Sequence, residues 1–577
     1  MSESAPSAVS ANRPARQVWR ALVVGLLLSL PLLIVWKGLA TPEQPPAADA
    51  KDKQPPPEDN KDKKKVPAPE LTGGVAWLNS GGPLTLKNDL KGKVVLLDFW
   101  TLCCINCIHI MPDLARLEKK WANELVVIGV HSPKFESEKD TRSIRKAILR
   151  YQIEHPVVND ADHKIWDAYE VDAWPTLVLI DPEGNLVGYT SGEGKYELLD
   201  AVIKKVVDEH REKKTLNDKP LNFDQAKYRD DGDSPLFFPG KVLADAKGNR
   251  LVIADSTHHR IVLTDLTGKF LDAAGTGNPG KADGNFDSAE FHDPQGLAIA
   301  GDTLYVADRK NHAIRELDLK GRTVRTIAGT GEQEGDITNR RLQKPVPASS
   351  IGLNSPWDLY LSGDQLFIAM AGHHQVWLLD LKTKQIGPYA GSGRENIADG
   401  PLPFAAFAQI SGITSDGKYL YTADCETSSL RKVPMTGTGR VETLVGRGLF
   451  IFGDQDGPGQ VEDTELLPTE ARLQHAMGVT YHDNKLYVAD TYNNKIRVFD
   501  LKTKQLSTLV GGNDWGWLVP SLFNEPAGLS YANGKLYVAD TNANRIRVVD
   551  LASRAVTTLP LTGVRRPVAA KEPAPKR

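Results

Sequence analysis

Three cysteines stand within five positions of the chain, in the segment DFWTLCCINCIHIMPDL at residues 98–114. They are Cys103, Cys104 and Cys107, and the rest of the 577 residues contain only one more, Cys425. Two cysteines separated by two residues can cycle between a dithiol and a disulfide, or can supply half of a zinc site. No second Cys/Cys or His/His pair stands at suitable spacing, so thiol chemistry is favoured over structural zinc.

The elements around these cysteines predict a small α/β domain. Continuous apolar runs at 93–100 and 125–130 are typical of buried strands. Helical patterns occupy about 104–123, 138–151 and 195–210, and a hairpin joins 176–180 to 185–189 through Asp-Pro-Glu-Gly. This order of elements predicts a mixed central sheet covered by helices.

The domain resembles the thioredoxin fold residue by residue. In that fold Asp-Phe-Trp closes a buried strand and the first redox cysteine follows six residues after the Asp, which here gives Asp98 and Cys104. The second cysteine falls at Cys107, and a helix-bending proline falls at Pro112. Trp174-Pro175-Thr176 matches the cis-proline segment that lies beside the redox pair.

The resemblance implies that Cys104 and Cys107 form the redox pair, as a disulfide that needs no other cofactor. Physical chemistry agrees, because Cys104 would stand at a helix N-terminus, whose free N–H groups and dipole stabilise a thiolate. Cys107, one turn inside the helix, would be shielded and would attack a mixed disulfide on Cys104. Asp98 is the candidate proton acceptor, with its pKa raised by burial, and Pro175 lines the substrate site.

Other residues near the pair have open roles. Trp100, Trp174 and Thr176 are expected to line the substrate groove. Cys103 is either a small buried filler or an auxiliary thiol, and a ring between it and Cys104 would be strained. His109 could tune the thiolate or be a solvated helix residue. His131 could face the site or simply end a strand.

A peroxidase is the enzymatic alternative. Peroxiredoxins carry the signature P-x-x-x-T-x-x-C, and Thr101 stands three residues before Cys104 as that signature requires. Leu97 occupies the position of its proline, which argues against peroxide reduction.

Residues 233–565 contain a repeat, which predicts an array of similar units. RLVIADSTHHRIVLTDLTG at 250–268 recurs as TLYVADRKNHAIRELDLKG at 303–321, and four further copies follow, ending with KLYVADTNANRIRVVDLAS at 535–553. Each unit has about four short strands, so six units predict a six-bladed β-propeller. The motif resembles the NHL repeat, in which we expect the Asp to bond backbone N–H groups of the turn after it.

Several propeller residues have both functional and structural interpretations. The pairs His258-His259 and His373-His374 fall in equivalent turns of separate repeats, which favours a repeat role over metal ligation. Some six-bladed propellers are metal-assisted hydrolases or lyases, but no convergent Glu/Asp/His set is visible, so no metal site is predicted. Cys425 is interpreted as a strand-end residue, with a distant redox role as the alternative.

The N-terminus is typical of a membrane-targeting segment. Basic residues in 1–20 precede an apolar run at 21–36, which is either a retained anchor or a cleaved signal, and both place the rest outside the cytoplasm. A spacer rich in Pro, Lys and Asp follows at 41–70. The predicted domains are then 71–212 and 233–565, joined by a linker at 213–232 and followed by a tail at 566–577.

The two halves in this order resemble the NHL repeat-containing protein 2 family over about residues 70–565, including the Cys-Cys-Ile-Asn-Cys cluster. We therefore expect a multidomain chain: an α/β thioredoxin-like domain, an all-β six-bladed NHL propeller and an N-terminal membrane anchor. The first hypothesis is a membrane-tethered, extracytoplasmic thiol–disulfide oxidoreductase with a protein dithiol or disulfide substrate and a propeller that binds a protein partner. The second is a binding scaffold with an inactive thioredoxin-like module. A net charge of -3 gives no indication of nucleic-acid binding.

Overall fold

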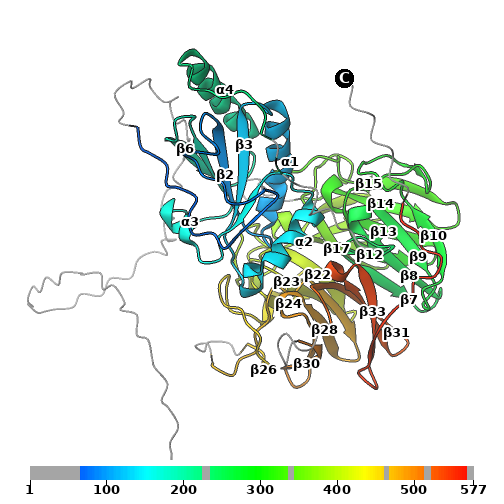
Figure 1. The fold of residues 1–577 in the computed structure, drawn as a ribbon. Coiled ribbons are helices and arrows are strands. Elements are labelled where there is room, and N and C mark those ends of the chain that lie inside the picture. Colours follow the sequence, from blue (N-terminus) through cyan, green and yellow to red (C-terminus); the bar gives the residue numbers. More distant parts are fainter. Residues whose placement is uncertain are drawn as a thin grey trace, which may run out of the picture. The chain divides into compact units, whose positions relative to one another are not determined.

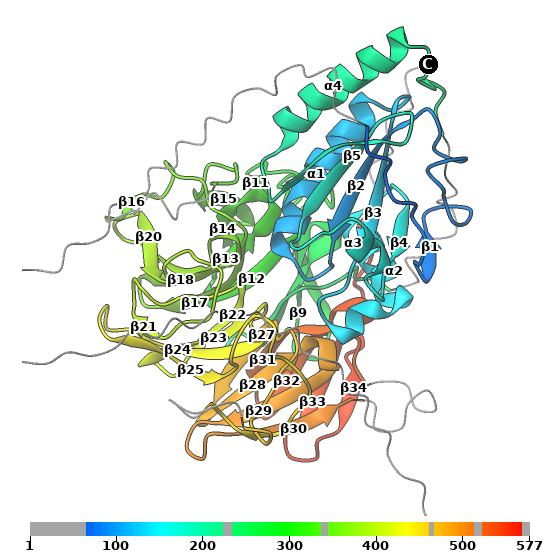
Figure 2. The same ribbon diagram turned by 90° about the vertical axis from the view of Figure 1, so that its left-hand side faces the viewer.

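The computed structural model describes residues 65–221, 223, 234–335, 344–460, 467–512 and 522–567. Residues from Lys65 onwards form one unit (Figures 1 and 2). The predicted basic region at 1–20, the predicted anchor at 21–36 and residues 41–64 of the predicted spacer lie outside the described residues, as do 224–232 of the predicted linker and 568–577 of the predicted tail. Among the residues described, no helix has the length and apolar character needed to cross a membrane.

The first domain is built on a six-stranded mixed sheet with the order β1-β4-β3-β2-β5-β6. Central strand β2 runs parallel to β3 and antiparallel to β5. In chain order the elements are β1 (Ala76–Leu78), β2 (Val94–Trp100), α1 (Ile105–Lys120), β3 (Leu125–His131), a 3-10 turn (Glu136–Lys139), α2 (Thr141–Tyr151), β4 (Val157–Asn159), α3 (Lys164–Ala168), β5 (Thr176–Ile180), β6 (Leu186–Ser191) and α4 (Tyr196–Glu212).

The predicted strands, helices and hairpin of this domain are confirmed, and three short elements were not predicted. β1, β4 and α3 contain only three to five residues, which is too short for hydrophobic periodicity to reveal them. Alternate residues of β2 point to opposite faces of the sheet: Val94 and Leu96 pack with α1 and α4, whereas Val95 and Leu97 join the other core cluster. The sheet is therefore buried on both faces, and α1 is held rigidly over β2.

The second domain consists of six antiparallel sheets within residues 234–567, which confirms the predicted six-bladed propeller. Blade one contains β7 (Val242–Asp245), β8 (Arg250–Asp255), β9 (Arg260–Thr264) and β10 (Phe270–Ala274); blade two β11 (Gly284–Asn285), β12 (Pro294–Ala300), β13 (Thr303–Asp308), β14 (Ala313–Asp318) and β15 (Thr323–Ala328); blade three β16 (Val346–Pro347), β17 (Pro356–Ser362), β18 (Gln365–Met370), β19 (Gln375–Asp380) and β20 (Gln385–Ala390).

The other three blades repeat the same plan. Blade four contains β21 (Gly400–Pro401), β22 (Ile410–Ser415), β23 (Tyr419–Asp424), β24 (Ser429–Pro434) and β25 (Arg440–Val445); blade five β26 (Gly457–Pro458), β27 (Gly478–His482), β28 (Lys485–Asp490), β29 (Lys495–Asp500) and β30 (Gln505–Gly511); blade six β31 (Pro526–Ala532), β32 (Lys535–Asp540), β33 (Arg545–Asp550) and β34 (Val556–Thr558). The innermost strands β7, β12, β17, β22, β27 and β31 pack against one another around the axis.

The repeat aspartate does not do what the sequence predicts. It was expected to bond N–H groups of the following turn, and this is wrong: Asp490 accepts from the N–H of Gln474, 16 positions earlier, at 2.8 Å. Its other oxygen accepts from Arg497 Nη1 at 2.8 Å, and both side chains are fully buried. The aspartate therefore ties its own strand to the segment entering the blade. Blade three has Met370 and Trp377 at these two positions, so an apolar pair replaces the ion pair.

A ring of six hydrogen bonds joins the blades. The residue that closes the turn between the second and third strands of each blade accepts the N–H of the residue entering the next blade's innermost strand, at 2.8–3.2 Å. Asn544 of blade six accepts from Phe238 of blade one and closes the ring. We call these bonds the interblade ring; its acceptors are His259, His312, His374, Ser428, Asn494 and Asn544, and its donors are Phe238, Asp293, Ser355, Gln409, His475 and Glu525.

Both members of every ring bond have left-handed backbone conformations. The donors have φ between 46° and 66° and the acceptors between 47° and 54°. Asn and His tolerate this region better than most residues, which explains their use in the turns. Burial lowers the pKa of His259 to about 4 and of His312 to about 3, so both stay neutral near pH 7 and Nδ1 can accept. The histidine pairs of the sequence therefore include structural ring members.

The propeller axis is closed by a lysine. Lys241, just before β7, donates from Nζ to the carbonyls of Ser411 at 2.6 Å and Met477 at 2.7 Å, and lies 3.3 Å from Asp358. These partners come from blades three, four and five. One buried ammonium group thus connects four of the six blades across the axis.

We expect the ring closure to depend on an acceptor at position 544. Asn544→Ala leaves the Phe238 N–H unpaired and places alanine at a left-handed position, so it should reduce the free energy of unfolding by about 2–3 kcal/mol. Asn544→His introduces the acceptor residue found in blades one to three and should reduce the free energy of unfolding by clearly less than Asn544→Ala does. Urea denaturation measures both, and an equal loss for the two variants would show that the hydrogen bond is not what matters.

Candidate functional site

The two cysteines predicted to form the redox pair lie where α1 begins. Cys104 is the N-cap residue of α1, and its Sγ accepts the N–H of Cys107 at 3.2 Å. Cys104 is partly exposed, whereas Cys107 is completely buried. All four cysteines are free thiols. This pairs an accessible sulfur at a helix N-terminus with a shielded sulfur one turn deeper.

Asp98 lies beneath this pair on β2. It is 1% exposed, and burial raises its pKa to about 7, an effect that the charge of His155 opposes and that of Glu118 reinforces. Burial also raises the pKa of Cys107 well above its usual value, and the hydrogen bond to Cys104 and the charge of Asp98 add to this. A carboxyl that titrates near neutral pH can take a proton from a thiol and give it up again.

The raised pKa of Asp98 predicts that the free energy of unfolding depends on pH. The pKa is about 7 in the folded chain and ~3.9 in the unfolded chain, so between these values the folded state binds the proton more tightly. The free energy of unfolding should therefore fall as pH rises through this window, by up to about 4 kcal/mol. Asp98→Asn removes this contribution and should be more stable than the parent at pH 8 but not at pH 4. Urea midpoints at the two pH values test this; an equal difference at both would contradict it.

The cis-proline segment is present, with Trp174–Pro175 as a cis peptide bond. Trp174 is partly exposed and, like Cys104, packs against the apolar cluster that contains Cys103 and Cys107; its Nε1 donates to the Ser132 carbonyl at 3.0 Å. The structure places Trp100 at 0% exposure and Thr176 at 4%, so both lie in the interior rather than in a groove.

Cys103 is held away from solvent. Its N–H donates to Glu138 Oε1 at 3.0 Å, and Thr101 donates to the other oxygen of the same carboxylate at 2.7 Å. Burial raises the pKa of Cys103 well above its usual value, and the charges of Glu138 and Glu426 contribute. These surroundings favour the interpretation of Cys103 as a packed filler.

The two histidines have different surroundings. His109 connects the two domains: its ring nitrogens contact Glu193 at 2.8 Å and the Ser355 hydroxyl at 2.7 Å. His131 is fully buried with its ring edge-on to Trp100, and burial lowers its pKa to about 3. His131 therefore stays neutral, while His109 contacts a member of the interblade ring.

Gln409, another member of the interblade ring, forms two hydrogen bonds to the backbone on either side of Cys104. Its Oε1 accepts the N–H of Ile105, the first residue of α1, at 2.8 Å, and its Nε2 donates to the Cys103 carbonyl at 2.9 Å. The same Nε2 lies 3.2 Å from Cys425 Sγ, whose thiol donates to the Gln409 carbonyl at 3.0 Å. Nothing in the sequence marked Gln409, because its partners lie 304 and 306 positions away.

The tip of α1 enters an apolar socket on the propeller. Ile105 is 2% exposed and packs with Trp357, Ala371, Cys425, Met477 and Ala527. Burying an isoleucine side chain is worth about 2–3 kcal/mol. Burial raises the pKa of Cys425, which suits a socket residue. Figures 1 and 2 both show α1 and α2 against the propeller.

A second anchor lies beside this socket. Phe135, after β3, packs against Phe452 at 4.5 Å between ring centroids and against His475 and Tyr492 at 5.4 Å each. Lys134 forms a buried ion pair with Glu426 of blade four. The predicted redox pair is thus fixed between two domains by apolar, charged and hydrogen-bonded contacts.

A cleft of about 670 Å³ opens next to the pair. It includes Asn106, which stands between Cys104 and Cys107. Both domains line it, and its other polar side chains are Glu193, Gln333, Asn354, His373, His374, Arg394 and Glu395. The wall opposite the cysteine loop therefore comes from the propeller.

Gln409→Glu tests whether the propeller influences the thiol. The carboxylate can still accept the Ile105 N–H, but it loses the donor to Cys103 and adds negative charge at the positive end of α1, which disfavours a thiolate. We expect alkylation of Cys104 by iodoacetamide at neutral pH, followed by peptide mass spectrometry, to slow about tenfold. Gln365→Glu, the same change at an exposed position on β18, is the control and should have no effect. Equal rates of Cys104 alkylation in Gln409→Glu and Gln365→Glu would show that the propeller does not influence this thiol.

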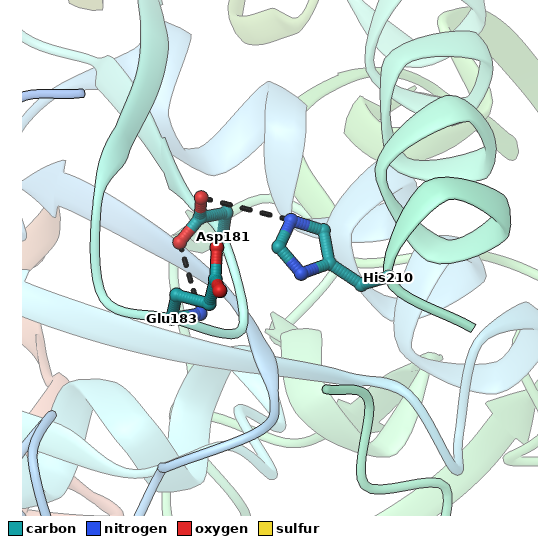
Figure 3. Close-up of side chains that lie close together, drawn as sticks. All are labelled: Asp181, Glu183 and His210. Carbon is teal, nitrogen blue, oxygen red and sulfur yellow. Dashed lines mark hydrogen bonds and ion pairs between the residues drawn. The ribbon is translucent and has the colours of Figure 1, made fainter. Parts of the chain in front are cut away.

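One further cluster lies at the other end of the sheet. Asp181, Glu183 and His210 approach one another around the β5–β6 turn and the end of α4 (Figure 3). Lys65 binds both carboxylates, and Asp181 accepts the N–H groups of Glu183 at 2.9 Å and Asn185 at 2.8 Å. These contacts connect the β5–β6 turn to Lys65 and to the end of α4.

Comparison with known proteins supports both domains. A thioredoxin-like family profile matches residues 92–186, and an NHL repeat profile matches 291–317 and 523–549. NHL repeat-containing protein 2 of Gallus gallus is 42% identical over 497 residues, covering 79% of this chain and 66% of that protein. The chain belongs to the NHL repeat-containing protein 2 family.

Two other relatives match different shares of this chain. Protein SUPPRESSOR OF QUENCHING 1, chloroplastic, of Arabidopsis thaliana is 41% identical over 466 residues, covering 78% of this chain and 43% of that protein. Thiol-disulfide oxidoreductase YkuV of Bacillus subtilis is 32% identical over 143 residues, a quarter of this chain and 95% of that protein. This chain spans 66% of the length of the Gallus gallus protein and 43% of the length of the Arabidopsis thaliana protein. The thioredoxin-like domain thus matches a relative named as a thiol-disulfide oxidoreductase over almost the whole length of that relative.

Proposed function

We propose that the protein is a thiol–disulfide oxidoreductase whose active site is completed by its own propeller. The observation that carries this proposal is the arrangement at the start of α1: a partly exposed Cys104 at the N-cap, bonded to the N–H of a buried Cys107. Asp98 lies beneath the pair with a pKa of about 7, and cis Pro175 follows Trp174 in the adjacent loop.

The chemistry is an exchange of two electrons. The Cys104 thiolate attacks a substrate disulfide, forms a mixed disulfide and releases one substrate thiolate. The Cys107 thiol gives its proton to Asp98 and attacks Cys104 Sγ, so a Cys104–Cys107 bond forms as the bond to substrate breaks. The substrate leaves with both sulfurs reduced. The reverse sequence oxidises a substrate dithiol.

The cleft supports a protein substrate presented as an exposed segment. The propeller covers Ile105 and Phe135, so the cysteine loop is shielded on that side. The 670 Å³ cleft beside Asn106 carries carboxylate, imidazole, amide and guanidinium groups, which suit a polar chain segment. We propose that the propeller selects the protein partner by forming one wall of the substrate site.

We also propose that the protein works outside the cytoplasm, tethered to a membrane. Support comes from the basic residues before the apolar run at 21–36, which favour a cytoplasmic N-terminus and export of the remainder. Disulfides persist in such compartments.

Cysteine variants test the assignment by reduction of insulin disulfides. Cys104→Ser should abolish activity, because the attacking sulfur is lost. Cys107→Ser should still attack but should accumulate a mixed disulfide that mass spectrometry detects. Cys103→Ser should keep most activity, since its thiol is buried beside Glu138. Equal loss from the changes at 103 and 104 would overturn the assignment, and an inactive parent protein would overturn the function.

A further inference from the structure

Three buried polar atoms beneath the redox pair have no hydrogen-bond partner: Asp98 Oδ1, Trp100 Nε1 and His155 Nε2. They meet at Gly129 on β3. Asp98 pairs with Gly129 in the parallel register of β2 and β3. A Cβ built on Gly129 would lie 2.9 Å from Trp100 Nε1, 3.2 Å from Val157 Cγ2 and 3.4 Å from His155 Nε2, so a side chain here would displace its neighbours. Glycine therefore lets two unpartnered nitrogens approach β3 in the space beside Asp98, and buried polar groups of this kind are the ones that an internal water pairs with.

His155 connects this space to the surface. Its Nδ1 lies 3.2 Å from Glu118 Oε2 of α1. The imidazole is 5% exposed, whereas the Glu118 side chain is 28% exposed. Asn79 fixes the loop by donating to the carbonyls of Ile153 at 2.8 Å and His155 at 3.1 Å. The ring is therefore held with one nitrogen toward the buried space and the other toward an exposed carboxylate.

We propose that His155 and Glu118 form the route by which the proton taken from Cys107 leaves Asp98. In this route a water bridges the Asp98 carboxyl and His155 Nε2, and Nδ1 passes a proton to Glu118 and solvent. The inference rests on the proposed function, since it concerns the second half of thiol–disulfide exchange. His155 acts through Asp98 and is a positioning residue, because it does not touch a sulfur.

The charges around the route are consistent with proton transfer. Asp98 faces Cys107 and Glu118 from α1 and His155 from the loop before β4. His155 faces Glu118, Asp98 and its neighbour Glu154. Burial alone would lower the pKa of His155, but these three acidic groups raise it instead. The imidazole can therefore carry a proton near neutral pH although it is buried.

A single-turnover reaction separates the two halves of the exchange. The reduced full-length protein is mixed with one equivalent of dithiobis(nitrobenzoate). Cys104 releases the first thionitrobenzoate by attacking the reagent, and Cys107 releases the second by attacking the mixed disulfide, while its proton leaves through Asp98. The two release phases are followed by absorbance as a function of pH.

His155→Gln should leave the first phase within twofold of the parent. It should slow the second about tenfold at pH 7 and move the midpoint of its pH profile upward, because the positive charge that lowers the pKa of Asp98 is lost. Glu118→Gln, at a partly exposed position that tolerates substitution, should slow only the second phase, by a smaller factor. His163→Gln in α3's cap is the matched control and should change neither phase.

The outcomes separate the two claims. If the parent protein releases no second thionitrobenzoate, the redox function itself fails. If the parent shows both phases and His155→Gln changes neither the rate nor the pH midpoint of the second, the proton route is refuted. If both phases slow equally in His155→Gln, the residue serves only the fold and the route is likewise refuted.

Discussion

The structure depends on the interblade ring. In each of six turns a left-handed residue offers an acceptor to the N–H of the next blade, and the bond between Asn544 and Phe238 closes the circle. Three of the six ring donors have side chains that reach the first domain. Ser355, Gln409 and His475 use this position to contact His109, the cysteine loop and Phe135. A backbone requirement of the propeller thereby becomes a binding surface for the first domain.

Because of that surface, both domains contribute to the proposed redox site. In an isolated thioredoxin-like domain the first N–H of α1 would face water; here Gln409 accepts it. Ile105 fills an apolar socket on the propeller, and Lys241 connects neighbouring blades by bonds to the Ser411 and Met477 carbonyls. The same contacts that position Cys104 shield it on one side. Access, polarity and orientation at the sulfur are therefore set partly by residues more than 300 positions away.

The sequence predicted what depends on local spacing. The cysteine pair, Asp98, the proline segment and the order of strands and helices all follow from patterns of short range, and six repeats were enough to predict six blades. It did not predict Gln409 or His155, because neither has a spacing or residue type that distinguishes it from ordinary polar residues. It misassigned the repeat aspartate, since the partner of Asp490 lies 16 positions away instead of in the adjacent turn. Trp100 was expected to line the substrate groove, yet it is 0% exposed.

The apolar contact between the domains has a consequence for synthesis of the chain. Ile105 and Phe135 are 2% and 1% exposed because propeller side chains cover them. The last helix of the first domain ends at Glu212 and the last strand of blade six at Thr558, 346 residues later. At ribosomal speeds of about 5–20 residues per second, roughly 20 to 70 seconds separate the two. During that interval Ile105 and Phe135 lack the propeller side chains that cover them, which leaves an apolar surface of the kind that chaperones bind.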